Sequence, residues 1–443
     1  MFQRKNFWVV GIFWIALHLL LTLSPLLILL IQLAPSGRGF WIEFSAAFGY
    51  VGLAMMMLQF ALTARFDAIA APYGIDIVLQ YHRYITQVAF ALILAHPIIL
   101  FFHDRQYLQA LNFFAAPWRA KFAIISTIAL ILLVVTSVWR QKLKLNYEVW
   151  RASHGIFAVT AVGLGLAHAF GVNYYLVLPW KALLWTLLAL VAFGSLIYVR
   201  LLKPWLMMQK PYRVETVLPQ RGNAWTLVLR PQGHEGIRFS PGQFAWLTLD
   251  RSPYHIQEHP FSFSSNGDRT DQVALTIKAV GDFTNKIKHI QPGTKAFLDG
   301  PHGAFTPDHV DFTGLVLIAN GVGVTPMFSI LVTFAQRGDR RPIHLIYANA
   351  SWENVAFCEE LEYLNKQLES LSVTHVIKKP PENWAGESGY INKEVLARHI
   401  PSDREGWRYF LCGSPRFLAE VEKALHELEV PAKYIHIEHF NLV

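Results

Sequence analysis

The sequence predicts a multidomain chain in which six transmembrane helices form a bundle, followed by a small antiparallel β-barrel and an α/β domain with a parallel sheet. The 443 residues are 53% hydrophobic and 16% charged, with a mean hydropathy of +0.30, which is too apolar for an ordinary soluble protein. The apolar runs stop near residue 205, and beyond it short strand-like runs precede alternating strand and helix patterns. We therefore divide the chain into domains at 1–206, 207–308 and 309–443.

The first domain contains six segments that are long and apolar enough to cross a membrane as helices, since a span needs about 20 residues. The first of them shows no small-residue cleavage site, so we expect a helix rather than a signal peptide. If the N-terminus is inside, Lys and Arg are more frequent in the inner connections than in the outer ones. This favours a multi-pass protein of the cell (inner) membrane whose later domains lie in the cytoplasm. The six segments are 7–33, 44–64, 79–102, 120–139, 152–171 and 178–202.

Four histidines lie in two of these segments with a common spacing. His82 and His96 are 14 residues apart in the third segment, and His154 and His168 are 14 residues apart in the fifth. Fourteen residues advance a helix by about 21 Å and through nearly four whole turns, so each pair lies on one face at two depths. The two segments run in the same direction. We therefore expect His82 to face His154 near the inner side and His96 to face His168 near the outer side.

Two such sites suit two b-type haems, because haem iron takes axial imidazoles and its flat apolar ring fits between helices. Iron with two axial histidines has no open position, so it transfers electrons rather than binding a substrate. We predict His82, His96, His154 and His168 as the iron ligands. The alternative is a membrane transporter or scaffold in which the histidines bind an ion or only pack, and this alternative predicts no haem.

The charged residues and cysteines exclude several other classes. The net charge of +8 does not indicate a nucleic-acid partner, because Lys and Arg flank the apolar runs rather than gathering in patches with aromatic residues. The two cysteines, Cys358 and Cys412, are too few for a disulfide framework or a cysteine-based metal site. No loop of the EF-hand pattern is present in the sequence, so calcium control through such a loop is not expected.

Strand patterns in the second half predict the barrel and then a parallel sheet of the nucleotide-binding type. The strand that ends at Asn320 is followed by Gly321-Val322-Gly323-Val324-Thr325-Pro326 and a helical run. Glycines at this point let backbone N–H groups approach a pyrophosphate at a helix N-terminus, although a tight turn alone would use them too. The expected strands are 212–219, 224–230, 243–250, 273–280, 295–299, 314–320, 342–348, 372–378, 408–412 and 434–438.

The order of these domains resembles the ferredoxin–NADP reductase superfamily, and one motif closely resembles ferric reductases and NADPH oxidases. His-Pro-Phe-Ser-Phe-Ser-Ser at 259–265 is similar to their segment along the FAD ring and phosphate arm. Residues 277–284 resemble their second flavin segment, in which Thr284 would cap a helix aimed at the pyrophosphate. Gly300-Pro301-His302-Gly303 resembles the turn that closes the flavin domain. The implied FAD-binding residues are His259, Pro260, Phe261, Ser262, Phe263, Ser264, Lys278, Gly281, Thr284 and Gly300.

The nucleotide domain and the four histidines resemble the same family. Cys412-Gly413-Ser414-Pro415 is similar to the Cys-Gly-x-Pro near the nicotinamide, and Glu438-His439-Phe440 resembles the end whose aromatic ring stacks on the flavin. The resemblance therefore implies catalytic roles for Cys412 and Phe440, and the four histidines match the family's membrane domain. The implied nucleotide-binding residues are Gly321, Gly323, Thr325, Pro326, Cys412, Gly413 and Phe440.

The resemblance implies an oxidoreductase that moves electrons from cytosolic NAD(P)H through FAD and two haems to ferric iron, or to O2 giving superoxide. Residues 348–351 and Tyr390 lack the Arg that binds a 2′-phosphate in relatives, so the nucleotide is left as NADPH or NADH. Leu100 stands where the oxygen-reducing branch carries a further histidine, so the acceptor is also open. The alternatives are a membrane-anchored flavin reductase and a haem subunit that feeds a partner redox protein.

Overall fold

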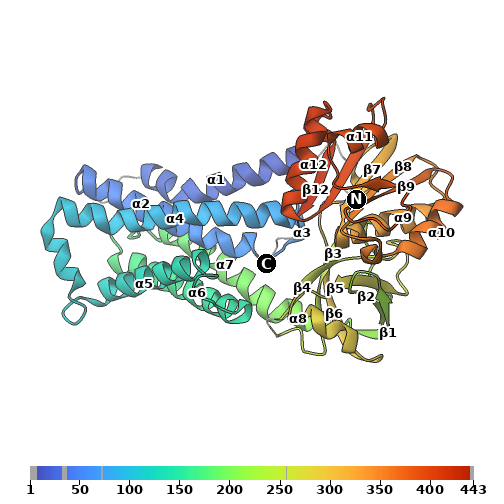
Figure 1. The fold of residues 1–443 in the computed structure, drawn as a ribbon. Coiled ribbons are helices and arrows are strands. Elements are labelled where there is room, and N and C mark those ends of the chain that lie inside the picture. The colour runs from blue at the N-terminus through green and yellow to red at the C-terminus, as the bar shows by residue number, and fades with distance from the viewer. Residues whose placement is uncertain (1–6, 32–36, 71–72, 256, 440–443) are drawn as a thin grey trace. The chain divides into compact units, whose positions relative to one another are not determined.

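The computed structural model describes residues 7–31, 37–70, 73–255 and 257–439, and it divides near Lys203 and Pro204 into two compact units (Figure 1). The first unit is helical. The second contains two six-stranded sheets. The domain boundaries expected at 206 and 308 stay a prediction.

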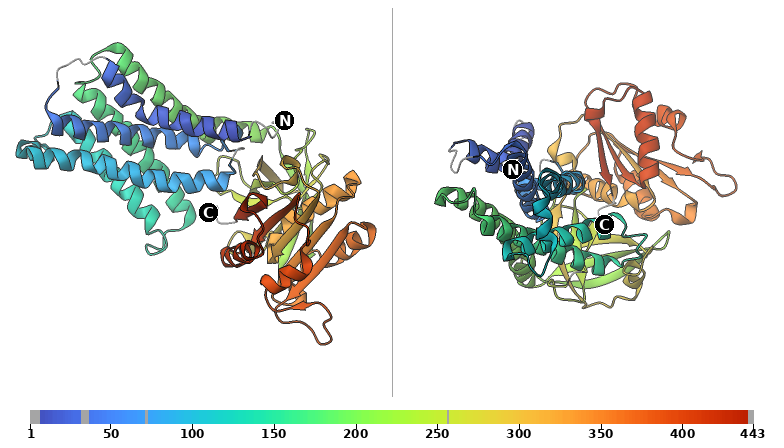
Figure 2. Two further views of the ribbon diagram at one scale, coloured as in Figure 1. Left: turned by 90° about the horizontal axis from the view of Figure 1, so that it is seen from above. Right: turned by 90° about the vertical axis from the view of Figure 1, so that its left-hand side faces the viewer.

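Six helices of the first unit are long and apolar enough to cross a membrane, which confirms the predicted helical bundle. Helices α5 and α6 pack against each other, as do α2 and α7, and α1 and α2 (Figures 1 and 2). Proline at the first turn starts α7, and α6 ends where Asn173 adopts a left-handed conformation. The long helices are α1 (Phe7–Ile31), α2 (Phe40–Leu62), α4 (Ile75–His103), α5 (Trp118–Val138), α6 (Tyr147–Val172) and α7 (Pro179–Ile197).

Small and flexible apolar side chains form the core of this helical unit. Its buried members include Met55–Met57 of α2, Ala89 of α4, Ala161 and Val162 of α6, and Trp185 of α7. Small residues at these contacts let helix backbones approach closely, which is how helices associate where lipid removes the hydrophobic driving force. The α7 helix continues through a π-helical turn at Tyr198–Leu202 into α8 (Lys203–Met208).

The first sheet is antiparallel throughout and has the strand order β4-β3-β6-β1-β2-β5. Beyond the end of β4, Phe263 forms a bridge with Leu275 of β5, so the two edge strands of the sheet meet. This is the predicted small barrel, with one strand, β4, that the sequence patterns did not predict. The strands are β1 (Tyr212–Gln220), β2 (Ala224–Pro231), β3 (Phe244–Leu249), β4 (His259–Ser262), β5 (Val273–Lys278) and β6 (Lys295–His302).

The second sheet is parallel and has the strand order β10-β9-β8-β7-β11-β12. The chain adds strands on one side of β7 up to β10 and then on its other side with β11 and β12, so the strand order reverses between β7 and β11. Helices α9 and α10 pack on one face, and α11 and α12 on the other. Both faces of β7 are therefore buried, as its continuous apolar run requires. The elements are β7 (Gly314–Asn320), α9 (Val324–Arg337), β8 (Ile343–Asn349), α10 (Cys358–Gln367), β9 (Leu371–Ile377), β10 (Glu387–Ser388), α11 (Lys393–His399), β11 (Trp407–Gly413), α12 (Pro415–Glu427) and β12 (Ile435–His439).

Candidate redox-cofactor sites

The four predicted histidines form two facing pairs between α4 and α6. The ring centroids of His82 and His154 are 6.4 Å apart, and those of His96 and His168 are also 6.4 Å apart. We call them the inner pair and the outer pair. All four side chains are half-buried. Each pair thus places two imidazoles near each other without direct stacking.

Hydrogen bonds fix the protonation of the inner pair. The Gln59 amide donates from Nε2 to Met55 O at 2.9 Å, so its Oε1 accepts from His82 Nδ1 at 3.1 Å. On the other ring, the Ser137 hydroxyl donates to Leu133 O at 2.7 Å and must therefore accept from His154 Nδ1 at 3.0 Å. Both rings carry their proton on Nδ1. Their Nε2 atoms then hold a free lone pair, which is the form that binds a metal.

The outer pair reaches the same protonation state through the main chain. His96 Nδ1 lies 3.0 Å from Ser45 O, and His168 Nδ1 lies 2.8 Å from Arg119 O. A carbonyl oxygen only accepts, so both Nδ1 atoms must donate. The Ser45 hydroxyl donates to His96 O at 2.8 Å and lies 2.8 Å from His96 Nδ1, which makes it a second acceptor for that ring. Both Nε2 atoms are again unprotonated.

Two neighbouring imidazoles with unprotonated Nε2 atoms offer two nitrogen ligands to a metal ion. Among the described residues, no hydrogen bond reaches Nε2 of any of the four rings. Two metal–nitrogen bonds of about 2 Å each, together with the two ring radii, roughly account for a centroid separation of this size. The described residues also contain no group of three or more His, Cys, Asp or Glu side chains able to hold a metal ion. A metal here would need its other ligands from a non-protein group, and the four nitrogens of haem meet that need.

A glycine of α2 makes room for the outer pair. A Cβ atom added at Gly49 would lie 3.2 Å from Cγ of the His96 ring, one helical turn after Ser45. Any larger side chain would push this ring away from the Ser45 carbonyl. Helical spacing identifies the histidines, but it says nothing about their neighbours on another helix, here Gly49, Ser45, Gln59 and Ser137.

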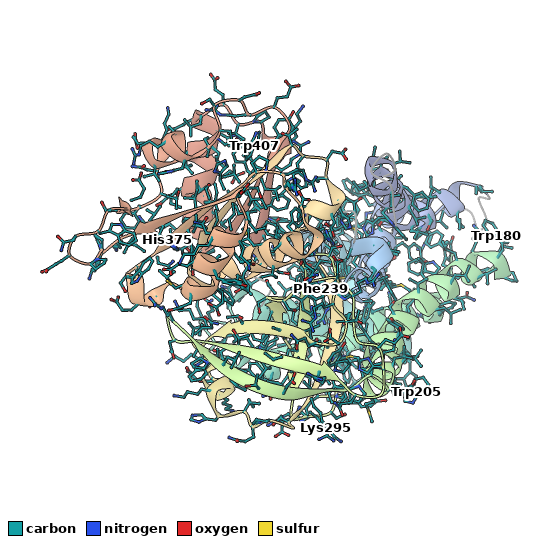
Figure 3. The ribbon with its side chains drawn as sticks, turned by 90° about the vertical axis from the view of Figure 1, so that its right-hand side faces the viewer. Trp180, Trp205, Phe239, Lys295, His375 and Trp407 are labelled. Carbon is teal, nitrogen blue, oxygen red and sulfur yellow. The ribbon has the colours of Figure 1, made fainter. Side chains whose placement is uncertain are left out.

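The segment expected to bind FAD forms β4 and pairs with β3. The His259 ring stacks on Phe283 with centroids 4.1 Å apart, and Phe261 lies parallel to Phe283 at 6.1 Å. Phe263 differs, because it is fully buried and stacks on Phe239 at 3.9 Å, in the barrel core. Phe239 is labelled in Figure 3. Phe263 therefore supports the strand from within, whereas His259 and Phe261 remain partly exposed.

The polar residues of this segment lie close by. Ser262 and Ser264 are buried, and Ser264 Oγ accepts a bond from Thr276 at 2.9 Å. Pro260 pairs with Trp246 of β3. Lys278 ends β5 and is half-buried.

Thr284 does not cap a helix, contrary to the expectation from the sequence. It is the first residue of a short 3-10 helix, Thr284–His289, and its hydroxyl accepts from the N–H groups of Val280 and Gly281, both at 2.9 Å. The hydroxyl thus orders the loop that precedes the helix. Gly300 of β6 lies against β3, where an added Cβ would be 2.9 Å from the Cβ of Ala245.

The glycine turn after β7 meets the end of β11 at the point where the strand order reverses. Gly321 has a φ of 55°, and a Cβ at Gly323 would lie 2.3 Å from Cys412 O. Only glycine permits this contact between Gly323 and Cys412. Ligands of open α/β sheets bind at this reversal, outside the carboxyl ends of the strands. Thr325 and Pro326 follow in the buried first turn of α9, where Thr325 Oγ1 donates to Val322 O at 2.7 Å.

Cys412 and Glu438 are register partners on β11 and β12, and both are buried. Burial raises the pKa of the Cys412 thiol well above its usual range and raises the pKa of the Glu438 carboxyl as well. At neutral pH Cys412 is therefore a thiol rather than a thiolate. Gly413 follows it, and a Cβ atom added there would lie 2.7 Å from Cδ1 of Phe417 on α12 and 3.0 Å from Cβ of Asn320. Phe440, the second predicted catalytic residue, lies outside the described residues.

Two lysines at the edge of the parallel sheet were not predicted from the sequence as site residues. Lys378 N donates to Asn349 O at 3.0 Å and Lys379 N donates to Ala350 O at 2.9 Å, so both continue the pairing beyond the ends of β8 and β9. Both side chains are exposed, and Lys378 Nζ lies 4.9 Å from the centre of the Tyr390 ring. Only the strand register brings these lysines beside Ala350, which is why sequence reasoning did not find them.

Comparison with known families assigns all three parts of the chain. Residues 48–165 match the ferric reductase like transmembrane component, residues 220–305 an FAD-binding domain, and residues 317–423 an oxidoreductase NAD-binding domain. The chain has the architecture of the ferric reductase/NADPH oxidase family. With six spanning helices, this ferric reductase-like chain is a multi-pass membrane protein, and its soluble domains are those of an NAD(P)H-dependent oxidoreductase.

Individual relatives of the ferric reductase-like chain match its soluble half. NADH-cytochrome b5 reductase 1 of Debaryomyces hansenii is 31% identical over 166 residues, which are 36% of this chain and 58% of that protein. The Arabidopsis thaliana protein of the same name is 30% identical over 146 residues, or 32% of this chain and 52% of that protein. The chain thus spans little more than half the length of these relatives. The cytochrome b5 reductase domain of Ulva prolifera nitrate reductase superposes with a TM-score of 0.47 at 18% identity, covering 52% of this chain and 97% of that one.

Proposed function

We propose that this chain is a transmembrane oxidoreductase that carries electrons from NAD(P)H, bound on the cytoplasmic side, to an acceptor on the other side of the membrane. The observation that carries the proposal is the hydrogen bonding of the two histidine pairs, in which every ring donates from Nδ1 and keeps Nε2 unprotonated, with ring centroids 6.4 Å apart in each pair. Pairs of this kind are the ligand sets that two haems need.

Each cofactor would be held by residues already described. His82 with His154, and His96 with His168, would hold the two haem irons. The glycine turn would receive the nucleotide pyrophosphate, and β4 would carry FAD. When bound, FAD links hydride chemistry to single-electron chemistry, and bis-histidine haem supplies single-electron transfer.

The residues around these sites have separate tasks. Gln59, Ser137, Ser45 and Arg119 hold the imidazoles in the tautomer that binds iron. The neutral Cys412 thiol would lie against the nicotinamide without adding a negative charge beside it. Phe440 would cover the flavin. The curated relatives are named for reduction of cytochrome b5 by NADH, and this chain would join a reductase of that kind to its own haem-binding bundle.

We further propose that NADPH is preferred over NADH. A 2′-phosphate attracts cations, whereas a site for the free 2′-hydroxyl of NADH usually offers a carboxylate after the second strand. Here Ala350 and Ser351 follow β8, and the exposed lysines Lys378 and Lys379 flank them. The acceptor is ferric iron or O2, and the cell membrane is the expected location.

The lysines can be tested by substitution. Lys378→Gln and Lys379→Gln should each raise KM for NADPH by about 10- to 100-fold, because a charge-assisted bond is worth about 1.5–3 kcal/mol. KM for NADH should not change. Lys366→Gln on α10 is the matched control, since this exposed lysine lies in the last turn of that helix. Equal KM values for NADPH in all three variants would contradict the preference.

The transmembrane path can be tested in sealed vesicles. Ferricyanide is enclosed in proteoliposomes, NADPH is added outside, and the loss of ferricyanide absorbance is followed. Reduction should occur with the parent chain and stop with His96→Leu, while this variant still reduces ferricyanide added outside. Equal reduction inside the vesicles by His96→Leu would leave a membrane-anchored flavin reductase as the function. Haem reduction without any acceptor reduction would favour a subunit that feeds a partner protein.

A further inference from the structure

Helix α9 carries a stripe of three polar side chains at intervals of four residues. Ser329, Thr333 and Arg337 therefore lie on one face of the helix, above one another. Ser329 and Thr333 are fully buried, which is unusual for polar residues unless they have bonding partners. Arg337 is at the C-terminal end and its side chain is 32% exposed.

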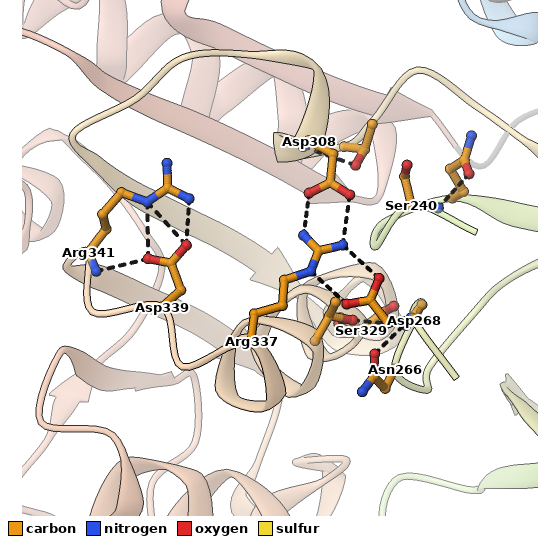
Figure 4. A network of polar contacts seen from close by, with 12 residues as sticks. Ser240, Asn266, Asp268, Asp308, Ser329, Arg337, Asp339 and Arg341 are labelled. Atoms are coloured by element: carbon orange, nitrogen blue, oxygen red, sulfur yellow. Dashed lines mark hydrogen bonds and ion pairs between the residues drawn. The ribbon is translucent and has the colours of Figure 1, made fainter. Parts of the chain in front are cut away.

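All three side chains bind one short segment of the barrel domain, residues 265–268. Ser329 Oγ donates to Ser265 O at 2.8 Å, and Thr333 Oγ1 accepts from Gly267 N at 3.0 Å. Arg337 forms a two-pronged ion pair with Asp268, with distances of 2.7 and 3.0 Å (Figure 4). From the N-terminal to the C-terminal end of α9, the three side chains contact residues 265, 267 and 268 in that order.

The same arginine also holds the connection between the two sheets. Arg337 Nη1 and Nη2 donate to the Asp308 carboxylate at 2.6 and 3.0 Å (Figure 4). Asp308 lies in the short 3-10 helix Pro307–His309 between β6 and β7. One guanidinium thus binds two carboxylates from different parts of the chain, and this double pairing raises the pKa of Arg337.

These contacts of α9 connect the two proposed cofactor sites. Its N-terminus begins at the glycine turn, where the nucleotide pyrophosphate is proposed to bind. The segment 265–268 follows directly on β4 and Ser264, where FAD is proposed to bind. The stripe on α9 therefore ties the element that would hold one cofactor to the element that would hold the other.

A second set of contacts joins the two domains through other elements. Gln220 accepts from Phe357 N at 3.1 Å through Oε1, and Gly222 N donates to Glu353 O at 3.0 Å. These bonds tie the β1–β2 turn to the region before and at the start of α10. With the α9 contacts broken, the domains would stay attached at this point but could rotate about it.

We propose that Ser329, Thr333 and Arg337 are positioning residues that fix the nicotinamide site against the flavin site. This inference rests on the proposed function, because it assumes that both cofactors bind as stated. The nucleotide itself would contact only the parallel-sheet domain, so its affinity should not depend on these residues. Hydride transfer should depend on them strongly, since a misplacement of about 1 Å can cost about 100-fold in rate.

The test uses Thr333→Val and Arg337→Gln in the full chain in detergent, with Arg341→Gln as the matched control. Arg341 also forms a two-pronged pair, in the loop that follows α9, but its partner Asp339 is two residues away and belongs to the same domain (Figure 4). NADPH-driven reduction of soluble ferricyanide gives kcat and KM. Hydrogen exchange of residues 265–268 reports the contact without depending on activity.

Both variants should lower kcat by about 10- to 100-fold and leave KM within about threefold. Exchange at Gly267 should be faster in Thr333→Val, and Arg341→Gln should match the parent. Arg337→Lys, which keeps the charge, should recover part of kcat. Unchanged kcat in both variants of an active parent would overturn the positioning role alone, and so would a higher KM with unchanged kcat. A parent that oxidises no NAD(P)H would overturn the proposed function and this inference with it.

Discussion

The inner and outer histidine pairs have the same ring separation, but different groups orient them. In the inner pair, side-chain oxygens of Gln59 and Ser137 accept from Nδ1. In the outer pair, the carbonyl oxygens of Ser45 and Arg119 do so. A side-chain acceptor can be removed by one substitution, whereas a carbonyl is present whatever the residue. The orientation of the inner pair is therefore encoded by residue identity, and that of the outer pair by backbone position.

The two pairs should accordingly differ in their sensitivity to mutation. The outer pair depends on the path of α2 past His96, which is set by the absence of a side chain at Gly49. The inner pair depends on its side-chain acceptors, because without them each ring would lack the bond that fixes its tautomer. Four substitutions separate these two kinds of dependence.

The largest effect is expected from Gly49→Val. Its side chain would occupy the space of the His96 ring, so the outer haem should be lost and the inner haem kept, which is a loss of about half the haem per chain. Haem per chain is measured by the pyridine haemochrome assay on purified protein. Gly194→Val on α7 is the control, since nothing lies within 4 Å of a Cβ added there. Full haem content in Gly49→Val would show that the ring position is not set by α2.

A smaller effect is expected from Gln59→Leu and Ser137→Ala. Removing an outer-shell acceptor typically costs about 10- to 100-fold in affinity for the metal group, so the inner haem should be lost to excess apomyoglobin faster than in the parent. Thr136→Val is the control for Ser137, because the Thr136 hydroxyl bonds only within its own helix. Equal rates of haem loss in the parent and in both variants would contradict the role of the inner acceptors.

The smallest effect is expected from Ser45→Ala. This change removes the hydroxyl but leaves the Ser45 carbonyl at 3.0 Å from His96 Nδ1, so the transfer of the outer haem to apomyoglobin should change by less than about threefold. A loss as large as that of Gln59→Leu would mean that the hydroxyl, and not the main chain, orients the outer ring.

Much of the fold could be predicted because its signals are periodic. Long apolar runs indicate spanning helices, and spacings of 14 residues identify the faces of α4 and α6. The strand β4 was missed because His-Pro-Phe-Ser is short, contains proline and does not alternate. It forms because β3 offers an antiparallel partner.

The site was predicted less completely, and the reason is physical. A histidine in a membrane helix indicates a metal site because imidazole is a common metal ligand. The group that accepts a hydrogen bond from that histidine lies on another helix, and no fixed sequence spacing relates the two residues. Gln59 and Ser137 could be found only once the helices were placed. Thr284 shows the opposite error, since the family resemblance of residues 277–284 implied a helix cap, whereas the Thr284 hydroxyl binds the preceding loop.

The measurement that tests the central claim most directly is a dithionite-reduced minus oxidised absorption spectrum, with haem counted per chain. The parent should show two low-spin b-type haems, and His82→Leu and His96→Leu should each retain one. No haem in the parent, or two haems in both variants, would contradict the claim that each facing pair of histidines holds a haem.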